Sequence, residues 1–277
     1  MYKVIEQEIR SKAADFSKCE DGIFVSSAFA AVIDGVTGKG KGLWDGKTSG
    51  AYAREVLLKC LKTLRADITA EEAIQVLNGA LYEAEKVRED ETELPREERL
   101  MAAVIIYSDC YQQIWSFGDC QCLINGELFS HSKKIDTMLS EVRSFYDRGQ
   151  LAAGMTPEEL QEHDIGREYI MPLLKFQLMY ANTEDYYGYD ILDGYEIHPK
   201  RVVIHQLKEG DRVVMASDGY PRLMETLEEI ESELARLIRE DPLCIFENKG
   251  TKGIAAGNNS FDDRSYIRFL VGKTENM

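Results

Sequence analysis

The chain of 277 residues contains few cysteines, prolines and histidines, with six, six and four of them. The cysteines are spread from Cys19 to Cys244, which is too sparse for a disulfide scaffold in a chain of this length. No stretch rich in proline, glycine or serine divides the sequence, and it has no repeat period. We therefore expect one domain that spans residues 1–277.

Long apolar runs and positive charges are also scarce. No segment approaches the run of roughly 18 apolar residues that a membrane-spanning helix needs, and residues 1–16 lack the apolar core of a signal peptide. The 33 basic residues are outnumbered by 49 acidic ones, so the formal net charge is −16. Such an excess of anions repels nucleic acid phosphates and an anionic membrane surface. We expect a cytoplasmic protein that binds neither nucleic acid nor a membrane.

Apolar residues recur with strand-like and helix-like spacing in separate blocks. Short or alternating runs predict strands over residues 3–9, 22–25, 29–33, 201–206, 211–216 and 265–271. Three consecutive runs over residues 101–108, 112–118 and 120–126 predict an antiparallel meander. Spacings of three and four residues predict helices over residues 48–64, 69–88, 134–149, 156–168 and 221–239. Because strands and helices come in blocks without strict alternation, the pattern indicates an α+β fold with sheets between helical layers.

Aspartates stand where several predicted strands begin or end. Asp34 and Asp218 follow apolar runs, and Asp21 and Asp262 precede them. A carboxylate at a strand end is held by the sheet yet reaches solvent, and several together form an all-oxygen site for a hard divalent cation. Glycine follows both Asp34 and Asp218, and an Asp-Gly pair taken alone is more often simply a turn.

The ordered set of these motifs resembles the metal-dependent protein phosphatase family of the protein phosphatase 2C type, over nearly the whole chain. Residues 19–21 (CED) look like the family's Asn-Glu-Asp element, and residues 31–40 (AVIDGVTGKG) look like its Asp-Gly-His-Gly-Gly loop. Residues 101–126 are similar to its central hairpins with their Gly-Asp turn, and residues 207–219 to its strand that ends in Ser-Asp-Gly. Residues 260–266 (SFDDRSY) resemble its final Asp-Asn element, with Asp263 where asparagine is usual.

The resemblance implies a four-layer α/β/β/α sandwich with two antiparallel sheets and a site for two Mn²⁺ or Mg²⁺ ions. By the same resemblance, Asp34, Asp218 and Asp262 are the catalytic carboxylates: Asp34 bridges both ions, and Asp218 and Asp262 bind the second. The carbonyl of Gly35 completes the first ion, while Glu20 and Asp21 act largely through metal-bound waters. A third, weaker ion would use Asp136 together with Asp218.

Two cations of this kind lower the pKa of a bridging water and orient a phosphoryl group for in-line attack, so no nucleophilic side chain is needed. The resemblance therefore implies a protein serine/threonine phosphatase, with a phosphorylated protein as its partner.

Two positions depart from the family pattern. Phe16 stands where the family often has a phosphate-binding arginine, which leaves Lys12 or Lys18 as the candidate for binding the substrate phosphate. Val36 replaces the loop histidine, a candidate proton donor to the leaving group. These departures keep two alternatives open: a pseudophosphatase or binding module with the same fold, and a phosphatase of a small phosphorylated metabolite.

Overall fold

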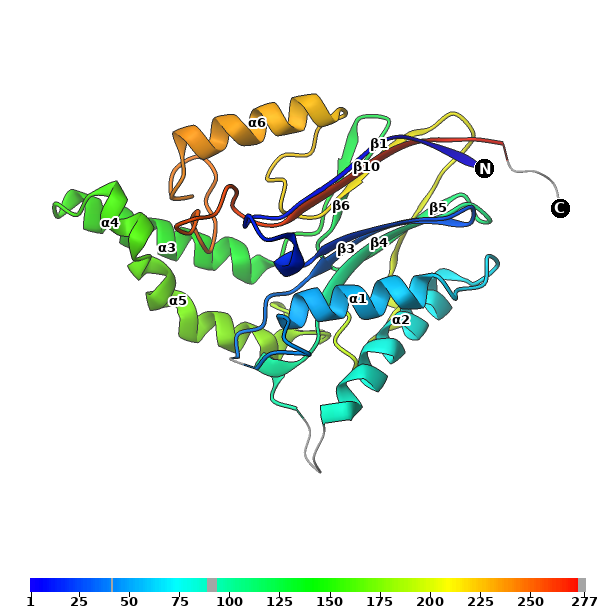
Figure 1. Cartoon of the computed structure of the whole chain (residues 1–277), viewed down its shortest axis with the longest axis horizontal. Coiled ribbons are helices and arrows are strands. Elements are labelled where there is room, and N and C mark those ends of the chain that lie inside the picture. The colour runs from blue at the N-terminus through cyan, green and yellow to red at the C-terminus, as the bar shows by residue number, and fades with distance from the viewer. Residues whose placement is uncertain (41, 89–93, 274–277) are drawn as a thin grey trace.

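Ten strands form two antiparallel five-stranded sheets in the computed structural model, which describes residues 1–40, 42–88 and 94–273 (Figure 1). The first sheet has the order β1 (Tyr2–Arg10), β10 (Arg264–Val271), β9 (Arg212–Ala216), β6 (Gln121–Ile124) and β7 (Glu127–Phe129). The second has the order β2 (Asp21–Val25), β3 (Phe29–Gly35), β4 (Ala102–Ser108), β5 (Gln113–Phe117) and β8 (Val203–Gln206).

Helices cover the outer faces of both sheets. The α-helices are α1 (Ser49–Leu61), α2 (Ala70–Glu85), α3 (Lys134–Ala152), α4 (Pro157–Glu162), α5 (Ile165–Phe176) and α6 (Leu227–Glu240). Short 3₁₀ helices are η1 (Phe16–Lys18), η2 (Lys86–Arg88), η3 (Arg96–Glu98), η4 (Gln177–Tyr180) and η5 (Pro199–Arg201). In Figure 1, α6 lies over the first sheet and α1 with α2 over the second, which makes four layers. In the described part of the chain, none of the helices is long and apolar enough to cross a membrane.

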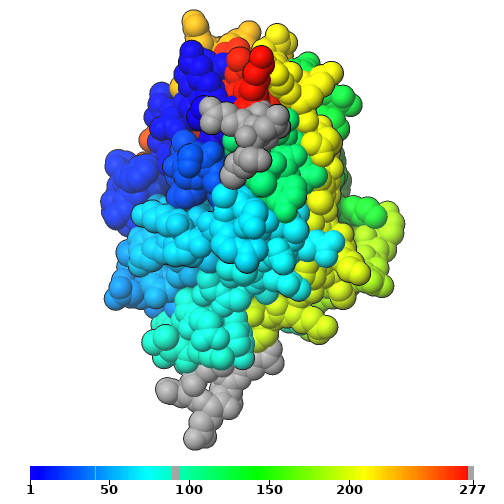
Figure 2. Space-filling view, turned by 90° about the vertical axis from the view of Figure 1, so that its right-hand side faces the viewer, coloured from blue at the N-terminus to red at the C-terminus, as the bar shows by residue number. Residues whose placement is uncertain are grey.

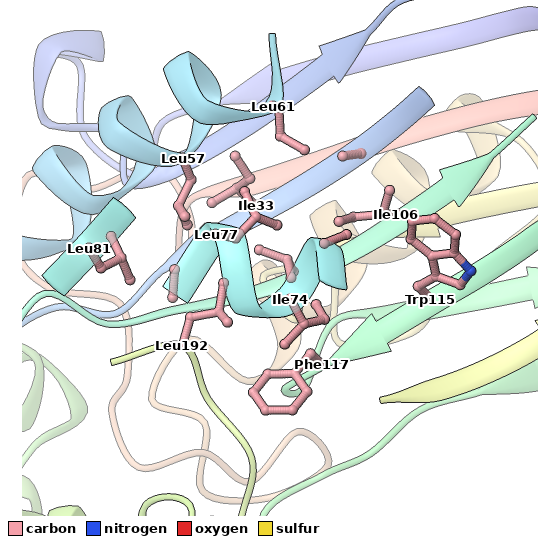
Figure 3. Packing of buried hydrophobic residues seen from close by; sticks show 14 of the residues in the cluster. Ile33, Leu57, Leu61, Ile74, Leu77, Leu81, Ile106, Trp115, Phe117 and Leu192 are labelled. Carbon is pink, nitrogen blue, oxygen red and sulfur yellow. The ribbon is translucent and has the colours of Figure 1, made fainter. Parts of the chain in front are cut away.

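Alternation along the central strands separates two of the hydrophobic cores. Ala31 and Ile33 of β3 pack with α1 and α2, whereas Ala30 and Val32 face the first sheet. Side chains of a strand point alternately to its two faces, so a strand covered on both sides reads as a continuous apolar run. Figure 3 shows the outer core, where Ile33 meets Leu57 of α1. The buried β3 explains why its end at Asp34 is held rigidly.

Local signals set the starts of several helices. In α2, the side chain of Thr69 accepts a hydrogen bond from the backbone N–H of Glu72, and the Glu72 carboxylate accepts one from the N–H of Thr69. The same capping box begins α4 and α6. Each box satisfies two backbone N–H groups that a helix start otherwise leaves free.

The two ends of the described chain lie together. Tyr2 of β1 pairs with Val271 of β10 in the antiparallel register. The blue and red segments accordingly meet at one end of the molecule (Figure 2). The opposite end of this strand pair brings residues 11–21 next to residues 260–263.

The predicted α+β fold with two antiparallel sheets is confirmed, but the predicted meander is wrong in its third strand. β4 pairs with β5, whereas β6 joins the other sheet and pairs with β7 and β9. Gly118 turns the chain between them with φ +107, and a Cβ there would lie 2.5 Å from the Cβ of Ala103. The chain therefore leaves the second sheet at Gly118 and Asp119.

Two predicted helices also differ. The helix predicted over residues 156–168 is two helices, because His163 is extended (φ −140, ψ 91) and Asp164 caps a new start by accepting from the N–H of Arg167. The acidic helix predicted from residue 221 begins only at Leu227, where Thr226 provides the cap.

Substituting Leu77 should destabilise the fold measurably, because its side chain is fully buried between α2 and the second sheet. Leu77→Ala is expected to lower the free energy of unfolding by about 2–5 kcal/mol through lost burial and the cavity left behind. Val76→Ala on the exposed side of the same helix is the control. Urea denaturation of both variants checks this, and equal losses would contradict the assignment of this core.

Candidate active site

Four predicted site aspartates converge at one end of the two sheets. Asp21 and Asp34 are opposite each other in the register of β2 and β3. Asp218 follows β9 and Asp262 precedes β10, and these two strands are neighbours in the first sheet. All four line one cavity of about 480 Å³, which residues of α3 and α5 also line. These two helices project from one end of the sandwich (Figure 1). The family resemblance implied one site for these four residues, and the packing of the sheets brings all four to one cavity.

The charges of Asp34 and Asp218 act on each other. Burial raises the pKa of Asp34 well above its usual range, and the negative charges of Asp218 and Asp21 raise it further. Desolvation, and then the charge of Asp119, raises the pKa of Asp218, while a hydrogen bond with Asp34 opposes that rise. Carboxylates this close disfavour simultaneous ionisation unless a cation joins them.

Asp21 and Glu20 are held by neighbouring side chains. Asp21 is buried and accepts a hydrogen bond from the hydroxyl of Ser265 at 2.8 Å, and burial raises its pKa to about 8. Glu20 accepts from Thr48 Oγ1 at 2.7 Å through one carboxylate oxygen, and from Thr37 through the other. These contacts fix both carboxylates at the edge of the cavity.

Asp262 is already neutralised by two lysines. Its Oδ1 lies 2.7 Å from Lys12 Nζ, and its Oδ2 pairs with Lys252. Burial alone would raise the pKa of Asp262, but the ammonium groups of Lys252 and Lys12 outweigh that effect and hold the pKa well below its usual range. Lys12 Nζ also lies 3.2 Å from Glu20 Oε2 and 3.3 Å from Asp263 Oδ2. Asp262 therefore differs from Asp34 and Asp218, which form no ion pair with a lysine among the described residues.

The backbone at Gly35 lies against the start of α1. A Cβ on Gly35 would stand 2.3 Å from the carbonyl oxygen of Gly50 and 2.8 Å from that of Glu20. Only glycine fits this approach. The turn after Asp34 therefore packs directly against the start of α1. The Gly35 N–H also donates a hydrogen bond to the Glu20 carbonyl at 3.1 Å.

Asp136 and Asp119 both line the cavity from other elements. Asp136, in the first turn of α3, accepts a hydrogen bond from Gln177 Nε2 at 2.9 Å. Asp119 pairs with Lys133 at 2.6 Å, and its charge raises the pKa of both Asp34 and Asp218. Sequence reasoning missed Asp119, although the same signal was present: an Asp in a glycine turn directly after an apolar strand.

The two lysines proposed for phosphate binding are in different situations. Lys12 lines the cavity, but its ammonium group is shared among three carboxylates. Lys18 is exposed on η1 and is not among the residues that line the cavity. Phe16, on the same short helix, is 54% exposed. Sequence reasoning also missed the five other basic residues of the cavity, which are Lys39, Lys133, Arg143, Arg167 and Lys252.

The donor set fits a divalent cation in its chemistry. Asp34, Asp218, Asp21 and Asp119 supply only carboxylate oxygens, which Mg²⁺ and Mn²⁺ prefer, and their mutual repulsion would be relieved by a cation. As they stand, no three acidic, histidine or cysteine side chains among the described residues are placed to hold one ion. Closing the site around an ion thus requires these carboxylates to move together.

Comparison with solved structures identifies proteins with a similar fold. No known protein-family profile matches the chain, and no curated protein sequence matches it. Among solved structures, it is similar to the catalytic domain of the serine/threonine protein phosphatase PstP, in complex with two manganese ions. The TM-score is 0.51 at 18% identity, covering 98% of this chain and 99% of that one. It is also similar to the serine/threonine phosphatase Stp1 from Staphylococcus aureus, with a TM-score of 0.51 at 15% identity, covering 99% of this chain and 96% of that one.

These likenesses show the fold, which is that of the metal-dependent protein phosphatases of the 2C type.

Proposed function

We propose that this protein is a cytoplasmic, metal-dependent phosphatase that hydrolyses phosphoserine or phosphothreonine in proteins with two Mn²⁺ or Mg²⁺ ions. One observation carries the proposal: Asp34 and Asp218, from two different sheets, meet in a cavity with a pKa raised in each. Acidic groups perturbed by burial and by each other at a cleft are typical of functional sites. The two similar solved structures, both serine/threonine phosphatases, support the same reaction.

Residues of this chain can be assigned to the cations. Asp34 would contact both ions, with the Gly35 carbonyl on the first and Asp218 and Asp262 on the second. Glu20 and Asp21 would act through water, and a third ion would use Asp136 with Asp218. When bound, the cations would lower the pKa of a water molecule and polarise the phosphoryl oxygens.

The surrounding side chains position these carboxylates. Thr37 and Thr48 hold Glu20, and Ser265 holds Asp21, so their oxygens are oriented before any ion binds. Val36 has no proton to donate, so a leaving group must be a good one or take its proton from another cavity residue. A phenolic ester such as p-nitrophenyl phosphate meets the first condition.

Metal removal and replacement tests the proposal. Protein stripped with EDTA is expected to hydrolyse neither p-nitrophenyl phosphate nor a phosphothreonine peptide, and added Mn²⁺ or Mg²⁺ should restore both activities. Buffers free of Zn²⁺, and a parallel assay with added Ca²⁺, are the controls for contaminating metals. Failure of fully loaded protein to hydrolyse either substrate would refute the function.

A binding module with the same fold is the second candidate, favoured by the lysine pair on Asp262. Lys12 and Lys252 compensate this carboxylate without any metal. Calorimetric titration with Mn²⁺ separates the two candidates. Stoichiometric uptake agrees with the phosphatase, and absence of uptake with the binding module.

A small phosphorylated metabolite is the alternative substrate class. The cavity of about 480 Å³ lies in the range of small-molecule sites, and Tyr189 contributes to its wall. Parallel assays with phosphopeptides and a set of small phosphomonoesters decide between these substrates.

A further inference from the structure

The cavity contains more positive charge than the sequence pattern indicated. Six basic residues line it: Lys12, Lys39, Lys133, Arg143, Arg167 and Lys252. Four of them are paired with carboxylates: Lys12 and Lys252 with Asp262, Lys133 with Asp119, and Arg143 with Asp147 and Asp164. Within the described parts of the chain, no carboxylate is in ion-pair contact with Lys39 or Arg167. These two cations are therefore the ones left to bind an anion that enters the cavity.

Lys39 lies in the loop that follows Asp34 and is partly buried. Its ammonium group donates a hydrogen bond to the backbone carbonyl of Thr37 at 3.2 Å. This carbonyl is neutral and does not compensate the positive charge of the lysine. Burial, and then the positive charges of Arg167 and Lys252, lower the pKa of Lys39 to about 8. These cations line the same cavity and repel one another, and an anion bound between them would relieve that repulsion.

Arg167 comes from the first turn of α5 and is also partly buried. Its Nη1 donates to the carbonyl of Thr251 at 2.8 Å, and its backbone N–H donates to Asp164 at 2.8 Å. No acceptor among the described residues is recorded for its Nε or Nη2. A guanidinium held at one nitrogen and open at the others can bind two phosphate oxygens at once.

We propose that Lys39 and Arg167 form the subsite that binds the phosphate group of the substrate. The subsite would take the place of the arginine absent at Phe16, with its charge supplied by the loop after β3 and by α5. Lys12 is committed to three carboxylates, and Lys18 lies outside the residues lining the cavity, which leaves these two as the binding groups. The assignment of the ligand as a phosphomonoester rests on the proposed function, whereas the affinity for a tetrahedral dianion does not.

Calorimetric titration with inorganic phosphate in saturating Mg²⁺ tests the subsite directly. Lys39→Met and Arg167→Met are each expected to weaken phosphate binding about ten- to a hundredfold, because each removes a charge-assisted hydrogen bond. The affinity for Mg²⁺, titrated separately, should be unchanged. Arg167→Lys should recover part of the loss, because it keeps the charge but not the two-pronged geometry.

Matched controls are Lys175→Met, on the exposed side of α5, and Arg148→Met, on the exposed side of α3. Phosphate affinities of Lys39→Met and Arg167→Met equal to those of the controls would overturn the subsite. So would a wild-type protein that binds no phosphate. Wild-type protein that binds phosphate through these residues but hydrolyses no ester would refute the phosphatase and leave the subsite standing.

Discussion

Asp34→Asn protein is expected to lose about a hundred- to a thousandfold in phosphatase activity, since a bound cation contributes several kcal/mol to the transition state. Asparagine keeps the size of the side chain and can still donate a hydrogen bond to Asp218, so the fold should be retained. The loss should appear in kcat at saturating Mn²⁺, with Asp67→Asn, at an exposed aspartate outside the cavity, as the control.

The same variant should be more stable than the wild-type protein when no divalent cation is present. Asp34 has a raised pKa in the folded state, so the folded state retains a proton that the unfolded state releases as the pH rises above about 4. The wild-type protein therefore loses stability as the pH rises from about 4 toward the raised pKa of Asp34 in the folded state. Asparagine does not titrate, so the variant does not have this loss.

Melting temperatures at pH 7 and at pH 4 check this effect. The advantage of Asp34→Asn should be present at pH 7 and shrink toward pH 4, where the wild-type carboxyl becomes protonated in the unfolded state as well. Added Mn²⁺ should then stabilise the wild-type protein more than the variant, because only the intact carboxylate set binds the ion in full. Equal stabilisation of both proteins by Mn²⁺ would contradict the role of Asp34.

Arg143→Met is expected to destabilise the protein by about 3–5 kcal/mol, the typical cost of breaking a buried ion pair from one side. Arg143 is 1% exposed, and its guanidinium bonds Asp164 at 2.7 Å and reaches Asp147 at 3.4 Å. Its Nη1 also donates to three backbone carbonyls, those of Leu243, Cys244 and Gly250. One side chain therefore connects α3, the cap of α5 and the segment that leads to Asp262.

Urea denaturation measures this loss, with Arg148→Met on the exposed face of α3 as the control. Adding Asp147→Asn to Arg143→Met should recover part of the stability, because it removes a buried negative charge that has lost its cation. A loss no larger than that of Arg148→Met would show that the network contributes little.

Most secondary structure followed from local pattern. β3 and β4 were predicted from short apolar runs, and these strands are covered on both faces in the structure. The helices that begin at the capping boxes of Thr69 and Thr156 were predicted from the spacing of apolar residues. The meander failed at β6, because a run of apolar residues does not reveal which of two sheets it joins. The single helix over residues 156–168 failed because the periodicity continues across the break at His163.

For the candidate site, too, some features follow from the sequence and others only from the tertiary structure. The sequence by itself determined where rigid carboxylates stand, since an aspartate after a buried strand is visible in the order of residues, as at Asp34 and Asp218. Only the tertiary structure decided their surroundings. Lys12 pairs with Asp262 across 250 positions of the chain, and the charge of Arg167, on α5, lowers the pKa of Lys39 in the loop after β3. The physical reason is that strand and helix preferences act between near neighbours, whereas charge pairing and cavity shape depend on which distant segments the folded sheets and helices bring together.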